Sequence, residues 1–98
     1  MPTLDLTPKA ELDLVGIWLY TCENWDADQA DKYLDQLASG MKYLLKHPLL
    51  GVEYSHIKPG YRRFRVEHHD IFYRPLESQV LVIRVLHEDM DAPKRLLD

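Results

Sequence analysis

The sequence predicts one small α+β domain, in which an N-terminal helical hairpin packs on a small antiparallel β-sheet and a short C-terminal helix or tail follows. A chain of 98 residues has room for one hydrophobic core, so residues 1–98 are expected to form a single domain. Apolar side chains recur every three or four residues up to residue 45 and every two residues from residue 49 onward. The composition, 46% hydrophobic and 29% charged, is that of a folded chain and not of a disordered one.

The first expected elements are a short strand, residues 3–6, and a helix that begins at Pro8. Thr7 can cap this helix, and Pro8 suits its first position because an N–H there has no helical partner. Apolar side chains follow at helical spacing over about four turns. We expect the following residues to face the core: Ala10, Leu14, Ile17, Trp18, Thr21, Cys22 and Trp25.

A second helix is expected to follow almost at once, because Asp26 and Gln29 have the spacing of a capping box. Lys42 and Lys46 suit the negative end of its dipole, and Pro48 stops it. Its core stripe is formed by Ala30, Tyr33, Leu34, Leu37, Met41, Leu44 and Leu45. The two helices should therefore form an antiparallel hairpin.

Strands are expected in the second half of the chain, where the period of the apolar side chains is two. Residues 61–67 alternate in character, and residues 69–74 form a second run that Pro75 is expected to end. Residues 80–86 are the richest in β-branched side chains, which predicts a central strand buried on both faces.

Arg84 is the anomaly in this last strand, because an unpaired buried charge costs several kcal/mol. One interpretation pairs its guanidinium with Glu67 or Asp70 across the sheet. The functional interpretation directs it into a groove. The other members of that groove would be Arg62, Arg63 and His87.

Two further residues carry potential chemistry. His87 precedes an acidic run at residues 88–91, which suits either a proton-transfer role or a simple structural bond. Cys22 is the single cysteine and is interpreted as a small core residue, with a reactive thiol as the alternative. No metal site is indicated around it, and no cofactor is expected.

Charge is segregated along the chain, although the net charge is only −4. Residues 1–40 carry two basic and eight acidic residues, whereas residues 41–85 carry eight basic and four acidic ones. This pattern is typical of solvated faces, and it could alternatively offer a basic surface to an anionic partner. No uncharged apolar run approaches the roughly 20 residues that span a bilayer, and the N-terminus has no signal-peptide pattern. A cytoplasmic protein without a membrane partner is expected.

Several motifs occur in a characteristic order over nearly the whole chain. They are Leu6-Thr7-Pro8-Lys9-Ala10, Asp13-Leu14 with Ile17-Trp18, Gln29-Ala30 with Tyr33, Pro48-Leu49-Leu50-Gly51, Pro59-Gly60-Tyr61-Arg62-Arg63, His69-Asp70-Ile71-Phe72-Tyr73-Arg74, and Ile83-Arg84-Val85-Leu86-His87-Glu88-Asp89-Met90-Asp91. Together they resemble the RelE/ParE superfamily of type II toxin-antitoxin systems, and the ParE-type toxins in particular.

The resemblance implies a helical hairpin packed on an antiparallel sheet, in agreement with the periodicity. It also implies a growth-arresting toxin of the kind found in plasmid stabilisation systems. A cognate ParD-like antitoxin, which dimerises and binds operator DNA, would silence it by wrapping its C-terminal segment around it. The implied target is DNA gyrase, whose cleaved DNA complex the toxin would stabilise. No catalytic residue and no direct nucleic-acid binding by the toxin alone are then required.

Two other functions remain open at this point. RelE-like relatives are ribosome-dependent mRNA endoribonucleases, and Arg63, Arg84 and His87 have residue types that suit phosphate binding and proton transfer. The thin basic cluster, the pI of about 5.7 and the lack of a Tyr after His87 argue against a nuclease. The third hypothesis is a non-toxic member that only binds its antitoxin and regulates transcription.

Antitoxin or target binding is expected to use an apolar groove or a free sheet edge. The candidate residues are Tyr54, Tyr61, Arg62, Arg63, Tyr73, Arg84 and His87. Packing in a small sheet explains the half-buried tyrosines equally well. Residues 91–98 are expected either to form a capped helical turn that presents Leu96 and Leu97 to a partner, or to fray.

Overall fold

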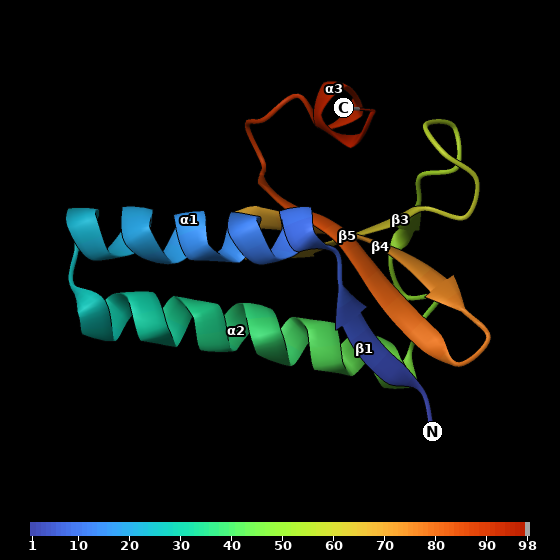
Figure 1. Ribbon diagram of the computed structural model, residues 1–98, viewed down its shortest axis with the longest axis horizontal. Coiled ribbons are helices and arrows are strands. Elements are labelled where there is room, and N and C mark those ends of the chain that lie inside the picture. Colours follow the sequence, from blue (N-terminus) through green and yellow to red (C-terminus); the bar gives the residue numbers. More distant parts are fainter. Residues whose placement is uncertain (98) are drawn as a thin grey trace.

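The computed structural model describes residues 1–97 and shows a helical hairpin against a five-stranded sheet (Figure 1). The elements are β1 (Thr3–Leu6), α1 (Pro8–Asn24), α2 (Ala27–Lys46), β2 (Val52–Glu53), β3 (Arg62–Val66), β4 (His69–Leu76), β5 (Gln79–His87) and α3 (Ala92–Leu96). The strand order is β1-β5-β4-β3-β2. The predicted α+β class is confirmed, with one difference in the sheet: β1 pairs with β5 in parallel, and the other pairs are antiparallel.

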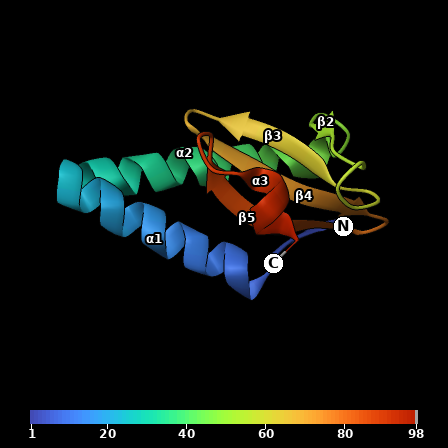
Figure 2. The same ribbon diagram turned by 90° about the horizontal axis from the view of Figure 1, so that it is seen from above.

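Both predicted helix caps are present. Thr7 Oγ1 accepts a hydrogen bond from the backbone N–H of Ala10 at 3.1 Å, and it donates its own proton to the carbonyl of Ile83 at 2.7 Å. The first cap therefore also ties the start of α1 to β5. Asp26 accepts from the backbone N–H of Gln29 at 2.8 Å and begins α2. The two helices lie side by side as the predicted hairpin (Figures 1 and 2).

The main core lies between the hairpin and the sheet. Its fully buried members come from both helices, β4 and β5: Ala10, Leu37, Met41, Leu44, Ile71, Tyr73, Val80, Val82 and Val85. The predicted stripe of α2 is confirmed. In α1 the prediction for Trp25 was wrong, because this residue is the C-cap of the helix and its side chain is 67% exposed.

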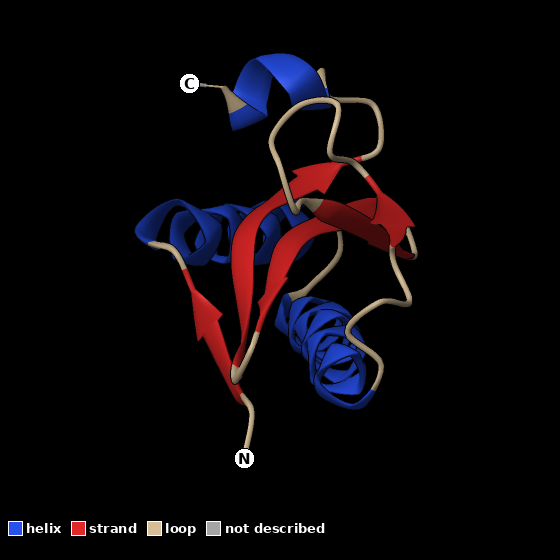
Figure 3. Cartoon of the chain, turned by 90° about the vertical axis from the view of Figure 1, so that its right-hand side faces the viewer, coloured by secondary structure: helices blue, strands red, loops and turns tan. Residues whose placement is uncertain are grey.

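A smaller core lies on the other side of the sheet, where α3 packs (Figure 3). Phe72, Leu86 and Leu96 are its buried members. The predicted C-terminal turn is confirmed, since the Asp91 carboxylate accepts from the backbone N–H of Lys94 and caps α3. The expectation that this turn presents both leucines outward needs correction. Leu96 is 6% exposed and holds α3 on the sheet, whereas Leu97 is 60% exposed.

The position of the strands differs from the prediction in two respects. The middle strand of the sheet is β4, which contains four consecutive buried residues from Asp70 to Tyr73, while β5 is only partly buried. Pro75 does not end β4 but pairs with Val80 inside it. Because β3 starts opposite Tyr73, this part of β4 has a strand on one side only, and a proline is tolerated there.

Tyr73 fixes the loop that leads from α2 to the sheet. Its ring is fully buried, its hydroxyl donates to the carbonyl of Pro48 at 2.7 Å, and it accepts from the backbone N–H of Gly51 at 2.9 Å. A Cβ on residue 51 would lie 2.7 Å from the Tyr73 ring, so only glycine fits. Arg62 Nη1 donates to the carbonyl of Gly51 at 2.7 Å. The contacts of Arg62 and Tyr73 are therefore structural ones.

We predict that Tyr73→Phe lowers the free energy of unfolding by about 1–3 kcal/mol, because it leaves a buried N–H and a carbonyl without their shared partner. Urea denaturation measures the change. Tyr43→Phe is the matched control, since Tyr43 is 52% exposed and its removal should change stability by less than about 0.5 kcal/mol. Equal effects of the two variants would contradict the assigned role of the hydroxyl.

Candidate functional site

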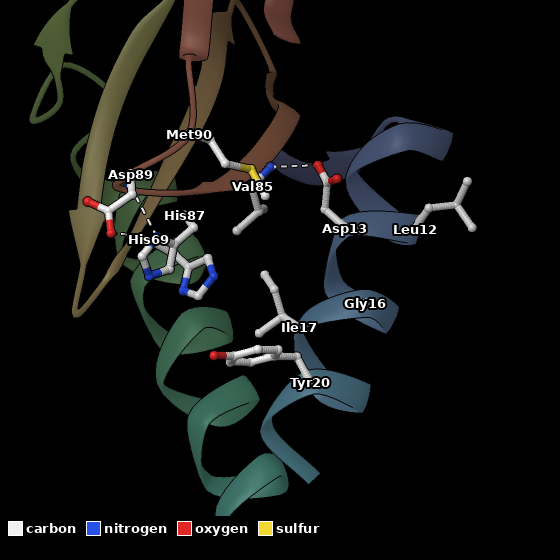
Figure 4. Close-up of a pocket in the computed structure, with 10 residues that line it drawn as sticks. All are labelled: Leu12, Asp13, Gly16, Ile17, Tyr20, His69, Val85, His87, Asp89 and Met90. Atoms are coloured by element: carbon white, nitrogen blue, oxygen red, sulfur yellow. Dashed lines mark hydrogen bonds and ion pairs between the residues drawn. The ribbon is translucent and has the colours of Figure 1, made fainter. Parts of the chain in front are cut away.

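A groove of about 560 Å³ runs between α1 and the end of β5 (Figure 4). Its residues include Leu12, Gly16, Tyr20, His69, His87 and Met90, and we call it the α1–β5 groove. A second hollow, of about 460 Å³, shares the tyrosine and both histidines and continues toward the tip of the helical hairpin. Most of the first groove is apolar in its lining, which suits binding more than hydrolytic chemistry.

The groove exists because β1 covers only part of the edge of β5. The parallel pairing ends at Leu6 and Val82, and α1 takes over beyond that point. The backbone N–H of Val85 donates to the carboxylate of Asp13 on α1 at 3.0 Å, so a helix side chain replaces the missing strand. Because a helix is wider than a strand, α1 does not follow β5 closely beyond Asp13, and a groove remains between the two elements.

Arg84 forms the most buried ion pair of the described chain, with Asp13 as its partner. Nε and Nη2 donate to the two carboxylate oxygens at 2.7 and 2.9 Å, and the two side chains are only 15% and 14% exposed. The third donor, Nη1, reaches the carbonyl of Arg95 in α3 at 3.3 Å. The predicted pairing of Arg84 with Glu67 or Asp70 was wrong, because the guanidinium binds Asp13 on α1, and the carboxylate of Asp70 is bound by Arg65 at 2.8 and 3.1 Å.

Two histidines line the groove from neighbouring strands. His69 and His87 are paired across β4 and β5, with ring centroids 5.2 Å apart at a nearly perpendicular angle. The backbone N–H of His68 donates to the Tyr33 hydroxyl at 3.3 Å, and this hydroxyl is also hydrogen-bonded to Nδ1 of His69 at 2.6 Å. Burial, with the nearby His87 and His68, lowers the pKa of His69 from 6.5 to about 4. His69 is therefore neutral at pH 7, and one of its two ring nitrogens donates while the other accepts.

The candidate nuclease residues do not meet on one surface. Arg63 and Arg84 flank Phe72 in the cross-strand register and so lie on the face that carries α3. His87 pairs with His69, which faces the helices through Tyr33. The guanidinium groups of Arg63 and Arg84 thus lie on one face of the sheet, and the imidazole of His87 lies on the other.

The candidate binding residues divide among three places. Arg63 lies over the ring of Tyr54 at 5.9 Å, and Tyr54 packs edge-on against Phe72. Tyr61 belongs to the same cluster on the α3 face. Arg62 and Tyr73 hold the loop before β2, and only His87 lines the α1–β5 groove.

The outer face of α1 was not among the sites predicted from the sequence. Four large apolar side chains are at least half exposed there: Leu12 at 70%, Val15 at 56%, Leu19 at 50% and Tyr20 at 63%. Their spacing is as helical as that of the core stripe, so α1 is apolar on two sides. This second apolar stripe is a signal that the sequence itself carries.

Two kinds of feature are absent from residues 1–97, the part of the chain that the structure describes. No group of three or more His, Cys, Asp or Glu side chains there is arranged to hold a metal ion. Within the same range, no helix combines the length and the apolar character that crossing a membrane requires.

Comparison with known proteins gives a consistent result. Residues 4–92 match the family described as the ParE toxin of the type II toxin-antitoxin system parDE. The chain is 37% identical to Toxin ParE1 of Mycobacterium tuberculosis over 92 residues, covering 93% of this chain and 94% of that protein. It is 35% identical to Toxin ParE1 of Caulobacter vibrioides over 91 residues, with 93% and 94% covered. Toxin ParE of Escherichia coli is 38% identical over 94 residues, with 95% and 91% covered.

The fold is also that of a solved structure. The chain superimposes on a chain of the chromosomal ParDE TA system from P. aeruginosa with a TM-score of 0.77 and 21% identity, covering 89% of this chain and 96% of that one. The mixed sheet and the helical hairpin are therefore an architecture already observed by experiment.

We predict that Asp13→Ala lowers the free energy of unfolding by about 2–4 kcal/mol, because it leaves the Arg84 guanidinium and the Val85 N–H without their carboxylate. Adding Arg84→Met should restore part of that loss, since no buried cation then remains. Denaturant titration of the single and double variants gives the comparison, with Asp35→Ala as the control, since Asp35 is exposed on α2. A double variant less stable than Asp13→Ala alone would contradict this account.

Protonation of His69 should make the protein less stable in acid. The unfolded histidine takes up a proton near pH 6.5 and the folded one only near pH 4. The contribution of neutral His69 to the free energy of unfolding is therefore fully present above about pH 7 and is lost as the pH falls from about 6.5 to about 4. The variant His69→Gln should flatten this part of the pH profile of unfolding, whereas His56→Gln should leave it unchanged. Parallel profiles for wild type and His69→Gln would contradict the assignment.

Proposed function

The chain belongs to the family of ParE toxins of parDE type II toxin-antitoxin systems, and we propose that it arrests growth by poisoning DNA gyrase. In this proposal the toxin binds gyrase and stabilises the state in which the enzyme has cleaved DNA and remains attached to it. Replication then stops at the trapped complexes. A cognate ParD-like antitoxin binds the toxin and silences it until it is needed.

The family match carries the proposal. It spans residues 4–92, and the relatives named ParE toxins are covered over 91 to 94% of their own length. Nearly every segment of those toxins thus has a counterpart in this chain. The system that the family description names pairs a toxin with an antitoxin, which supports an antitoxin as the partner.

The arrangement of the charged side chains supports a poison over a ribonuclease. Cleavage of RNA through the 2′-hydroxyl needs a base, an acid and cations around one phosphate. Arg84 is held by Asp13 and by the carbonyl of Arg95, and His87 lies on the other face of the sheet from Arg63. A toxin that acts by binding does not need these groups to converge.

The experiment is a supercoiling assay with purified toxin, gyrase, ATP and plasmid, analysed after treatment with detergent and protease. We expect supercoiling to be lost and linear DNA to accumulate with increasing toxin, because the detergent releases DNA ends from trapped complexes. Toxin pre-mixed with its antitoxin and reactions without gyrase are the controls, and neither should give linear DNA.

Unchanged supercoiling with a preparation that still arrests growth on expression would reject gyrase as the target. The ribosome-dependent nuclease would then be tested next on translating mRNA. A preparation that neither traps gyrase nor arrests growth would identify a non-toxic, antitoxin-binding member of the family.

A further inference from the structure

Two arginines on the α3 face of the sheet are held in place by their surroundings but have no carboxylate partner. Arg63 is partly buried, and its guanidinium lies 5.9 Å from the centre of the Tyr54 ring. Arg74 is exposed on the same face, two positions after Phe72 in β4. None of the ion pairs formed within residues 1–97 involves either arginine. Their charges are therefore available to an anion from outside the chain.

Other arginines of the sheet show the contrast. Arg65 and Arg84 each bind both oxygens of a carboxylate of their own chain, at distances between 2.7 and 3.1 Å. Those two guanidinium groups stabilise the fold. Arg63 is positioned by an aromatic ring instead, and this contact leaves its N–H donors free to bind an anion.

The loop before β3 orders the side chain of Arg74. Gly60 in this loop has a φ of 83°, and a Cβ on it would lie 3.1 Å from Nε and 3.5 Å from Cγ of the arginine. Glycine therefore lets the loop backbone lie directly against the arginine side chain. A side chain that is already held in this way loses less conformational entropy when it binds a ligand.

Three more basic side chains surround these two arginines. One belongs to the loop of residues 54–61, whose Ile57 packs in the smaller core, and two belong to α3, which covers the same core. All three are exposed, and no ion pair within residues 1–97 involves them. We call the five residues the cationic face: Lys58, Arg63, Arg74, Lys94 and Arg95. The carboxylates of Asp70 and Glu88, which reach the same side of the sheet, both pair with Arg65.

The phosphates of a nucleic acid suit this surface better than an acidic protein does. Tyr54 and Tyr61 are partly buried between the cations, and arginines interleaved with aromatic rings are typical of nucleic-acid surfaces. The fork of a guanidinium also matches two phosphate oxygens. Residues 1–40, most of which form the hairpin on the other side of the sheet, carry eight acidic and two basic residues. Such a dipolar molecule turns its cationic face toward a polyanion.

We propose that the cationic face binds the phosphate backbone of the DNA that gyrase holds in the trapped complex. The inference rests on the proposed function, which places DNA beside the bound toxin. Contacts of Arg63 and Arg74 with phosphates give the toxin a higher affinity for gyrase that holds DNA than for the free enzyme. A poison needs such a difference, because a ligand shifts an equilibrium only toward the state that it binds more tightly.

The first experiment titrates a fluorescent DNA duplex of about 30 base pairs with purified toxin and measures anisotropy at about 50 to 200 mM salt. We expect sequence-independent binding that weakens as salt increases. The double variant Arg63→Gln/Arg74→Gln should weaken binding at least about tenfold and reduce the salt slope by about two, one for each lost phosphate contact. Lys42→Gln/Lys46→Gln removes the same charge from exposed positions of α2 and should change the affinity less than about threefold.

A single variant separates binding from folding, since Arg63 also packs on Tyr54. Arg74→Gln changes an exposed residue, so its melting temperature should stay within about 2 °C of wild type. Its affinity for the duplex should still fall about threefold, and its salt slope by about one.

The second experiment measures the affinity of the toxin for gyrase with and without bound DNA. The double variant Arg63→Gln/Arg74→Gln should bind DNA-free gyrase within about threefold of wild type. It should bind the gyrase–DNA complex at least about tenfold more weakly than wild type does. Equal losses in both states would assign these arginines to a contact with gyrase itself and would overturn the inference.

The remaining failures are distinguishable. No duplex binding by the wild-type toxin at about 50 mM salt, or unchanged binding by the double variant, would overturn the inference and leave gyrase poisoning intact. Tighter binding of an RNA duplex of the same length would overturn the assignment to DNA, and tighter binding of polyglutamate would assign the face to an acidic protein. A toxin that binds DNA through this face but never traps gyrase would reject the proposed function and, with it, the place given to the DNA.

Discussion

The ion pair between Asp13 and Arg84 determines how the helical hairpin meets the sheet. Beyond Val82, β5 has lost its neighbour β1 and would expose an unpaired N–H beside a poorly solvated guanidinium. One carboxylate from α1 satisfies both groups, and the same guanidinium reaches α3 through the carbonyl of Arg95. The pair thereby fixes α1 beside the end of β5, where the α1–β5 groove lies.

Much of the fold could be predicted because its determinants are local. The caps at Thr7 and Asp26 depend on residues three positions away, and the apolar stripe of α2 repeats within single turns. The partner of Arg84 could not be predicted, since 71 positions separate it from Asp13 and several carboxylates were equally plausible in the sequence. The exposure of Trp25 was missed for a related reason, because periodicity does not show that the helix ends one residue earlier.

The candidate site was less predictable than the fold. The arginines and tyrosines chosen for their chemistry divide between two faces of the sheet, because which face a side chain occupies depends on strand register. His69 was not recognised as part of the groove, since its contact with Tyr33 crosses 36 positions of sequence. The outer face of α1 did carry a local signal, a second apolar stripe, that a single-stripe interpretation overlooks.

Two of these features support the proposal that the toxin acts by binding: the outer face of α1 is apolar and exposed, and Arg84 and His87 lie on opposite faces of the sheet. The most direct test of that claim is made in living cells shortly after expression begins, by measuring gyrase covalently attached to chromosomal DNA and the integrity of mRNA in the same culture. The account predicts that gyrase–DNA adducts accumulate while transcripts remain intact. Cut transcripts without adducts would contradict it.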